Sequence, residues 1–248
     1  MGVDIMVEST GLFTSAEKAR GHIEAGAKRV VISAPGKGAG VETVLLGVNE
    51  EKLATCEISS NASCTTNAVG PVMGILDEAI GIERAILNTT HAYTASQAIV
   101  DGVAPDDFRR GRAGAINMGP SSTGAAKATA LVYPQFKGKF DGIAVRVPVA
   151  SGSLADVTFV AKRATSAEEV NEALRAAAKT ERWKKVFSVT EEPLVSSDIL
   201  GLPYGSIADL GMTRVVDGTL VKVLAWYDNE MGYAHTLVQH VLAVTKHL

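Results

Sequence analysis

Apolar positions in the first part of the chain follow the periods of a strand, a helix and a second strand. Residues 3–8 and 28–35 are short runs rich in valine and isoleucine, which is typical of buried strands. Between them, Thr14-x-x-Glu17 is typical of a capping box and predicts a helix running to about residue 25. This order predicts a βαβ unit of a parallel sheet.

Two further apolar runs and a helical period follow this unit. Residues 41–47 and 56–60 are expected to be strands, preceded by a glycine-rich loop at 36–40. From residue 67 to residue 80 the apolar positions have helical spacing, and they are Val69, Val72, Met73, Leu76 and Ile80.

The rest of the chain changes character, because longer strands dominate it. The predicted strands are 84–94, 140–148, 153–163 and 219–228, and the predicted helices are 122–132, 166–179 after the capping box Ser166-x-x-Glu169, and a last helix from 229. Residues 95–120 show no clear period, and a loop of that length is usually functional. We expect an α+β domain with helices on one face of a mostly antiparallel sheet.

Composition narrows the function classes. The 248 residues are 46% apolar and 21% charged with a net charge of −3, and no basic run of nucleic-acid-binding type occurs. No apolar run reaches the roughly 18 residues of a membrane helix, and the N-terminus lacks a signal-peptide pattern. The two cysteines, Cys56 and Cys64, fit neither a disulfide framework nor a zinc site. We expect a soluble protein of the reducing cytoplasm, with no nucleic-acid or membrane partner and no metal.

Cys64 lies in the stretch SNASCTTN at 60–67, where a strand gives way to a helix. Ser63 or Thr65 can cap that helix. A cysteine in a first helical turn feels the positive end of the helix dipole, which lowers its pKa and makes it a candidate nucleophile. The alternative is a small buried residue, and for Cys56, in an apolar run without a cap, that is the only interpretation.

His91 stands at the end of a predicted strand, where the long loop begins. A histidine there and a cysteine at a helix start can meet on one rim of a sheet, as a base and a nucleophile. A structural histidine is the alternative.

Arginines and hydroxyl residues add a second theme, because both bind anions. Arg146 lies inside an apolar strand, where it requires either an anionic ligand or a structural salt bridge. The loop arginines Arg109, Arg110 and Arg112 form either an anion site or a solvated face. Hydroxyl groups in loops or at helix starts, where phosphate binds, belong to Thr94, Ser122 and Thr123.

Taken together, these residues resemble the phosphorylating glyceraldehyde-3-phosphate dehydrogenase family, over essentially the whole chain. The motifs in the family's order are NASCTTN at 61–67, THAYT at 90–94, RRGRA at 109–113, SSTGAAKA at 121–128, RVP at 146–148, PLVSSDI at 193–199 and WYDNEMGY at 226–233.

The resemblance implies a role for each matching residue. Cys64 would attack the aldehyde, and His91 would activate the thiol and accept the proton. Thr94 and Arg146 match the site for the phosphate of glyceraldehyde 3-phosphate. The site for inorganic phosphate is matched by Ser63, Thr123 and Arg110. Asn229 matches the residue that holds the nicotinamide carboxamide, and Tyr233 matches a neighbour of that ring. The family is also expected to form a homo-tetramer.

Several positions depart from the family pattern. Met231 stands where tryptophan is usual, and Ala95 and Ser96 replace an Asn-Asp type pair near the cofactor. Gly102 and Val103 replace a Leu-Pro pair common in NAD-preferring members. We therefore expect NAD, with NADP as the alternative.

The family opens with a Rossmann half that carries a Gly-rich phosphate turn, and no GxGxxG occurs in these 248 residues. The resemblance therefore implies a chain lacking the N-terminal part of the NAD-binding domain. The expected fold is α/β plus α+β. A residual half of a Rossmann-type parallel sheet at 1–63 precedes a catalytic domain at 64–228, and the C-terminal helix 229–248 packs back on the first domain.

Three alternatives stay open at this point. The chain could be an inactive family member that acts as an assembly or binding partner of an N-terminal fragment or a full-length subunit. Erythrose 4-phosphate is the runner-up substrate within the family. A cysteine hydrolase built on Cys64 and His91 is the third, although it would not need Asn229 or two phosphate sites.

Overall fold

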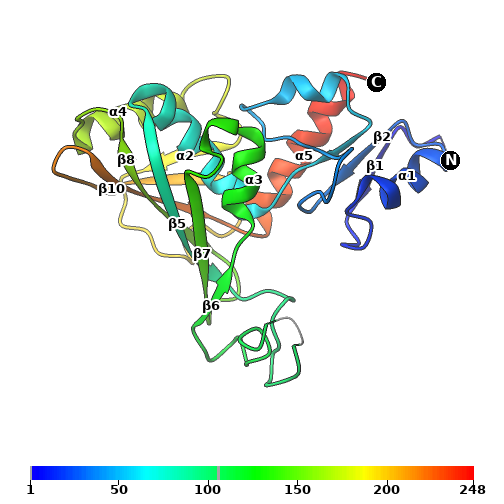
Figure 1. Cartoon of the computed structure of the whole chain (residues 1–248), viewed down its shortest axis with the longest axis horizontal. Coiled ribbons are helices and arrows are strands. Elements are labelled where there is room, and N and C mark those ends of the chain that lie inside the picture. Colours follow the sequence, from blue (N-terminus) through cyan, green and yellow to red (C-terminus); the bar gives the residue numbers. More distant parts are fainter. Residues whose placement is uncertain (1, 105–106) are drawn as a thin grey trace.

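The computed structural model describes residues 2–104 and 107–248, and two sheets form its frame (Figure 1). The smaller sheet has four parallel strands in the order β1-β2-β4-β3. Its elements are β1 (Ile5–Glu8), α1 (Ala16–Glu24), β2 (Arg29–Ile32), β3 (Glu42–Thr43) and β4 (Ile58–Ser60). The strand–helix–strand start of the chain is thus a βαβ unit, as the apolar pattern predicts.

The larger sheet has seven strands in the order β6-β7-β5-β8-β11-β10-β9. Their bounds are β5 (Ile82–Ala92), β6 (Gly119–Ser122), β7 (Phe140–Val147), β8 (Ser153–Ala161), β9 (Phe187–Thr190), β10 (Ser206–Val216) and β11 (Leu220–Tyr227). Only the pairs β5–β7 and β9–β10 are parallel, and the other pairs are antiparallel. The predicted fold class, a parallel sheet followed by a mostly antiparallel one, is confirmed.

Helices cover one face of the larger sheet. They are α2 (Cys64–Ala79), α3 (Ala125–Val132) and α4 (Ala167–Ala178), and the short 3-10 helices are η1 (Glu50–Ala54) and η2 (Pro134–Phe136). The central helix is α2, because it contacts β5, β8, β10 and β11 and buries most of its length in the main core. The opposite face leaves large apolar side chains exposed: Ile86, Ile143, Met212, Val216 and Leu220.

The C-terminal helix α5 (Met231–Thr245) joins the two parts of the molecule (Figure 1). It contacts β2 and η1 on one side and α2 on the other. No helix in the described residues is long and apolar enough to cross a membrane.

Two predictions in the first domain are wrong in detail. Ser15, not Thr14, caps α1, because the Thr14 carbonyl already accepts a hydrogen bond from the Lys37 amide and is held outside the helix. Only Glu42–Thr43 of the predicted strand 41–47 pairs in the sheet. The apolar residues that follow turn into the core instead, where the Asn49 side chain accepts the Leu45 amide.

Other differences arise where a short or irregular element hides its period. The polar strand β6 pairs with β7, so the helix predicted at 122–132 begins only at Ala125. The strands β9 and β10 are not predicted, and β10 has an irregular register between Asp209 and Arg214. The helix predicted from residue 67 begins at Cys64, and Cys56 lies in the loop before β4 rather than in a strand. Residues 105–106 of the predicted loop lie outside the described residues.

Candidate active site

The carboxyl ends of β5 and β7 meet the first turn of α2. Because β5 and β7 run parallel, His91 stands directly opposite Arg146 in the ladder. Ser63 caps α2 by accepting the Thr66 amide at 3.1 Å, which makes Cys64 the first residue of the helix. The preceding residue, Ala62, has a left-handed φ of 53° and turns the chain from β4 into α2.

Cys64 and His91 are in contact, as predicted from the sequence. The Cys64 Sγ lies 3.5 Å from the His91 Nε2. The other ring nitrogen, Nδ1, lies 2.7 Å from the Ala92 carbonyl and 2.8 Å from the Arg146 Nη1, which can only donate. In the tautomer that carries its proton on Nδ1 and donates it to the carbonyl, the Nε2 lone pair faces the sulfur. The pair can therefore move a proton from the thiol to the ring.

The prediction that the helix start lowers the thiol pKa is wrong for this structure. Burial raises the pKa of Cys64, and hydrogen bonds from Thr65 and the charge of Arg146 offset only part of that rise. Burial, followed by the charge of Arg146, lowers the pKa of His91 to about 4. Both directions favour a thiol beside a neutral imidazole over an ion pair, and a neutral ring is available as a proton acceptor.

Tyr227, which the sequence reasoning missed, links the elements that carry this pair. Its buried hydroxyl lies 2.9 Å from the Thr65 hydroxyl and 2.7 Å from that of Thr89. Its ring also meets the His91 ring edge-on, with centroids 5.8 Å apart. The signal available was its place in the WYDNEMGY motif, although nothing in that motif shows what the hydroxyl binds.

Arg146 stands beside this pair without a counterion. Its Nη1 lies 2.8 Å from the His91 Nδ1 and donates to the Ala92 carbonyl at 3.1 Å, while its Nε is buried without a partner. No described carboxylate forms an ion pair with Arg146, so the structural salt bridge that was the alternative is not observed. An orphaned guanidinium N–H beside a nucleophile is suited to an anionic ligand.

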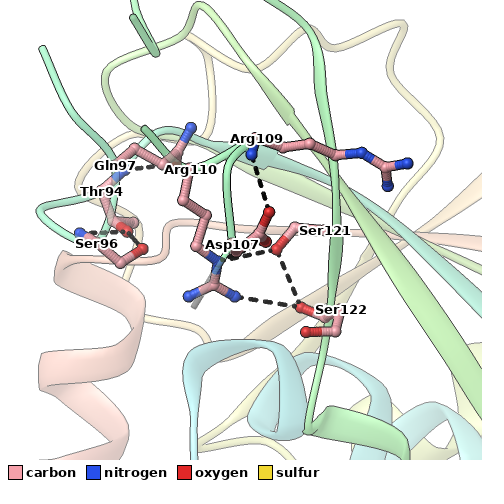
Figure 2. Close-up of polar contacts among 8 residues, drawn as sticks. All are labelled: Thr94, Ser96, Gln97, Asp107, Arg109, Arg110, Ser121 and Ser122. Atoms are coloured by element: carbon pink, nitrogen blue, oxygen red, sulfur yellow. Dashed lines mark hydrogen bonds and ion pairs between the residues drawn. The ribbon is translucent and has the colours of Figure 1, made fainter. Parts of the chain in front are cut away.

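Arg110 belongs to a second cluster, in the long loop (Figure 2). Its Nε donates to the Ser121 hydroxyl at 3.1 Å and lies 3.4 Å from a carboxylate oxygen of Asp107. Arg110 and Ser121 line a cavity of about 490 Å³ together with Ser96, Asp107, Arg109 and Ser122. The charge of Arg110 also contributes to lowering the pKa of Arg146, after burial and against nearby groups that raise it, so the two guanidinium groups lie within electrostatic range.

The remaining predicted phosphate residues lie near these clusters without joining them directly. Thr94, three residues after His91, shares a hydroxyl contact of 2.9 Å with Ser96, and its amide bonds to Gln97 (Figure 2). Thr123 accepts the Ala125 amide at the start of α3. Among the described residues, no hydrogen bond joins Ser63 to Thr123 or Arg110, or Thr94 to Arg146.

The guanidinium groups of the other two loop arginines, Arg109 and Arg112, form no hydrogen bond within the described residues of the cluster around Arg110. Arg112 forms an exposed ion pair with Asp101. The side chain of Arg109 points away from the cluster, although its amide donates to Asp107 (Figure 2).

Asn229 is held rigidly at the rim of the site. Its Oδ1 accepts the Gly152 amide at 3.2 Å and the Ser153 hydroxyl at 2.8 Å, and Ser153 in turn accepts the amide of Ala92. Its Nδ2 donates to the exposed side chain of Glu230. The amide orientation is therefore fixed, with its donor side turned toward a group that can exchange partners.

The start of α5 is organised by Asp228, which sequence reasoning also missed. Burial would raise the pKa of Asp228, but hydrogen bonds from the Gly201 and Glu230 amides and from the Ser151 hydroxyl keep it below its usual value. Tyr233, one turn further on, donates to the Ala62 carbonyl at 3.1 Å and so touches the turn before Cys64. Among the described residues no cluster of three metal-binding side chains occurs.

Comparison with known proteins identifies the family of this chain. Residues 63–229 match the family "Glyceraldehyde 3-phosphate dehydrogenase, C-terminal domain". The chain is 50% identical to the glyceraldehyde-3-phosphate dehydrogenase of Mycobacterium avium, over all of this chain and 72% of that protein. It is 49% identical to the same enzyme of Zymomonas mobilis, over all of this chain and 74% of that protein, and to that of Xanthobacter flavus, over 99% and 73%.

These matches place the chain in the class of oxidoreductases. The chain belongs to the glyceraldehyde-3-phosphate dehydrogenase family.

Proposed function

We propose that this chain carries the catalytic machinery for oxidative phosphorylation of glyceraldehyde 3-phosphate, with NAD as hydride acceptor and inorganic phosphate as second substrate. The observation that supports it most is the contact of Cys64 with His91, flanked by Arg146 without a counterion. A nucleophile, a base and a free cation within a few ångströms suit an aldehyde that carries its own phosphate.

The residues divide the reaction between them. His91 Nε2 takes the thiol proton as the Cys64 sulfur adds to the aldehyde carbon, which gives a thiohemiacetal on Cys64. Bound NAD supplies the acceptor for the hydride that leaves this carbon. Inorganic phosphate attacks the resulting thioester on Cys64, which breaks the carbon–sulfur bond and releases the acyl phosphate. The departing thiolate takes back the proton held on His91 Nε2, which restores the thiol and the neutral ring. The substrate phosphate would bind Arg146, which then stops competing with His91 Nδ1 for the Ala92 carbonyl.

The residues at the rim fit the nicotinamide end of NAD. Since Oδ1 of Asn229 is fixed by Gly152 and Ser153, its Nδ2 is the group left to donate to a carboxamide oxygen, in exchange for the exposed Glu230. Tyr233 would lie beside the ring. No Gly-rich turn for the pyrophosphate occurs in these 248 residues, so we propose that they bind NAD weakly by themselves.

We also propose that the chain assembles as a homo-tetramer. The uncovered face of the seven-stranded sheet, with its exposed apolar residues, is a surface suited to subunit contact.

Alkylation of Cys64 by iodoacetamide tests the central contact without requiring turnover. Burial raises the pKa of both thiols, so the difference between them is the base. We expect Cys64 to react faster than Cys56 near neutral pH, because His91 can take its proton, whereas no base among the described residues contacts Cys56. The replacement His91→Ala removes the base and should slow the alkylation of Cys64 by about 100-fold, while the alkylation rate of Cys56 stays unchanged. Peptide mapping measures both rates, and equal rates at the two cysteines of the unaltered chain would refute the assignment.

A further inference from the structure

A buried chain of side-chain hydrogen bonds lies behind the catalytic turn, between β4 and α5. His240 Nε2 lies 2.9 Å from the Ser59 hydroxyl, and His240 Nδ1 lies 3.2 Å from the Asn61 Oδ1. Asn61 Nδ2 donates to the Thr236 hydroxyl at 3.1 Å. All four residues are at most 2% exposed. The order of serine, histidine and amide is that of a hydrolase triad, but a serine sealed from solvent reaches no substrate.

The direction of each hydrogen bond follows from counting protons. Thr236 has a single hydroxyl proton, which goes to the Tyr233 carbonyl at 2.8 Å, so its oxygen must accept from Asn61. The Oδ1 of Asn61 then faces His240, so His240 carries its proton on Nδ1 and donates it. The Nε2 is left as an acceptor for the Ser59 hydroxyl. Every polar atom in the chain has one role, which fixes the rotamers of all four residues.

This network ends on the backbone that presents Cys64. Asn61 immediately precedes Ala62, whose left-handed φ of 53° is unfavourable for a residue with a Cβ and persists only where the surroundings impose it. Asn61 is also held through its carbonyl, which accepts the Asn67 side chain at 2.8 Å. Two residues further on, Ser63 caps the helix that begins at Cys64.

We propose that His240 is a positioning residue: through Asn61 it fixes the left-handed turn at Ala62 and thereby the place of the Cys64 sulfur opposite His91. Its importance for catalysis rests on the proposed function, whereas its hold on the turn does not. His240 touches no reacting atom, and its two ring nitrogens have separate tasks. The Nδ1 side holds the turn, and the Nε2 side only anchors the ring to β4.

Two substitutions separate these tasks. In His240→Asn the side-chain amide reaches the Nδ1 position and keeps the bond to Asn61, whereas in His240→Gln it reaches the Nε2 position and keeps only the bond to Ser59. Ser59→Ala is a matched control that cuts the Ser59 end alone. Each variant loses one buried hydrogen bond, so all three should lower the unfolding temperature by similar amounts.

The full chain is then assayed for iodoacetamide alkylation of Cys64 and for amide hydrogen exchange of the peptide spanning 60–67. We expect His240→Gln to slow alkylation about tenfold and to speed exchange in this peptide. His240→Asn and Ser59→Ala should stay within about twofold of the unaltered chain. Unchanged exchange in His240→Gln, or equal effects in His240→Gln and His240→Asn, would overturn the proposal. Slow alkylation of Cys64 in the unaltered chain would instead refute the proposed function, while the exchange data still decide the role of His240.

Discussion

Arg146 and Arg110 are the two arginines that we propose as anion ligands, and their surroundings differ. Arg146 extends from the strand β7, next to the edge of the larger sheet, is partly buried and has no carboxylate partner among the described residues. Arg110 extends from a loop, is about one-third exposed and already pairs with Asp107. The first guanidinium lacks a counterion, and the second must exchange one.

This difference bears on how each site binds phosphate. A cation held by a sheet and partly removed from water gains strongly from a charged ligand and loses little side-chain freedom on binding. A loop cation gains only the difference between its ligand and its internal partner, in a more screened environment. We therefore expect tight, geometry-dependent binding at Arg146 and weaker, salt-sensitive exchange at Arg110.

Acid should destabilise the surroundings of two buried histidines, His91 beside Arg146 and His240 behind the catalytic turn, far more than the loop of Arg110. The folded pKa of His91 and that of His240 are each lowered to about 4 by burial, below the ordinary value of 6.5. The unfolded chain then binds protons more readily, so this stability is complete above about pH 6.5 and is lost as the pH falls toward 4. At pH 5 each histidine should contribute about 2 kcal/mol less to the free energy of unfolding than at pH 8.

Urea unfolding at the two pH values measures this loss. The replacement His91→Gln should remove about half of the pH dependence, because one of the two buried histidines no longer titrates. Residues 95–118 contain no histidine, so their protection from hydrogen exchange, relative to the intrinsic exchange rate at each pH, should change little over the same range. A pH dependence that survives in full in the variant would contradict this account.

The next largest effect is expected from removing the strand-held cation. Arg146→Ala should weaken binding of glycerol 3-phosphate, a non-oxidisable analogue, by about 100-fold, because a charge-assisted pair in a partly buried site is lost. Calorimetric titration gives the dissociation constant. Arg163→Ala, which removes an exposed ion pair with Glu169, is the control and should bind normally. Similar weakening in both variants would indicate a general charge effect rather than a site.

Removing the loop cation should have a smaller and more selective effect. Arg110→Ala is expected to weaken the binding of inorganic phosphate by about tenfold and to change the binding of glycerol 3-phosphate by less than about twofold. Arg112→Ala removes a neighbouring charge that pairs with Asp101 and serves as the control. Competition between the two anions, followed by titration, measures the selectivity. If Arg110→Ala weakens the binding of both anions equally, the two arginines serve one site.

The smallest change should come from freeing Arg110 of its internal partner. Asp107→Asn removes the competing charge but keeps a side-chain oxygen for the Arg109 amide. Binding of inorganic phosphate should strengthen by about threefold, as expected for an exposed ion pair worth under about 1 kcal/mol. Titration at low and high salt should show the gain shrinking as salt screens the pair. Weaker binding would mean that Asp107 orients Arg110 rather than competes for it.

Sequence alone was enough for the parts of the fold that have a regular period. The βαβ start, the N-cap at Ser166 and the long strands around His91 and Arg146 follow from apolar spacing and turn chemistry. The reciprocal bond of the predicted capping box is not formed, because the Glu169 carboxylate binds Arg163 and Thr165 instead. The meeting of Cys64 and His91 follows from their places at a helix start and a strand end. These features are local, or arise where strand ends share one edge of a sheet.

What sequence could not supply is pairing between distant segments. The contacts of the Tyr227 hydroxyl join distant parts of the chain, because Thr65 and Thr89 precede Tyr227 by 162 and 138 positions. The direction of the Cys64 pKa was missed because the local helix-start effect is outweighed by burial, which only the tertiary structure determines. Likewise, the partner of Arg110 could not be chosen among the nearby acids of the loop.

Because His91 stands opposite Arg146 on parallel strands, the sheet fixes the distance between the two side chains. Neighbouring strands lie about 4.8 Å apart, so the backbone ladder, rather than a loop, sets the offset between His91 and Arg146. A slip of one residue between β5 and β7 would turn one of the two side chains to the other face. Under the proposed function, the number of carbon atoms between the aldehyde and the phosphate is therefore set by these two strands, whereas the loop after β5 contributes Thr94 and Arg110.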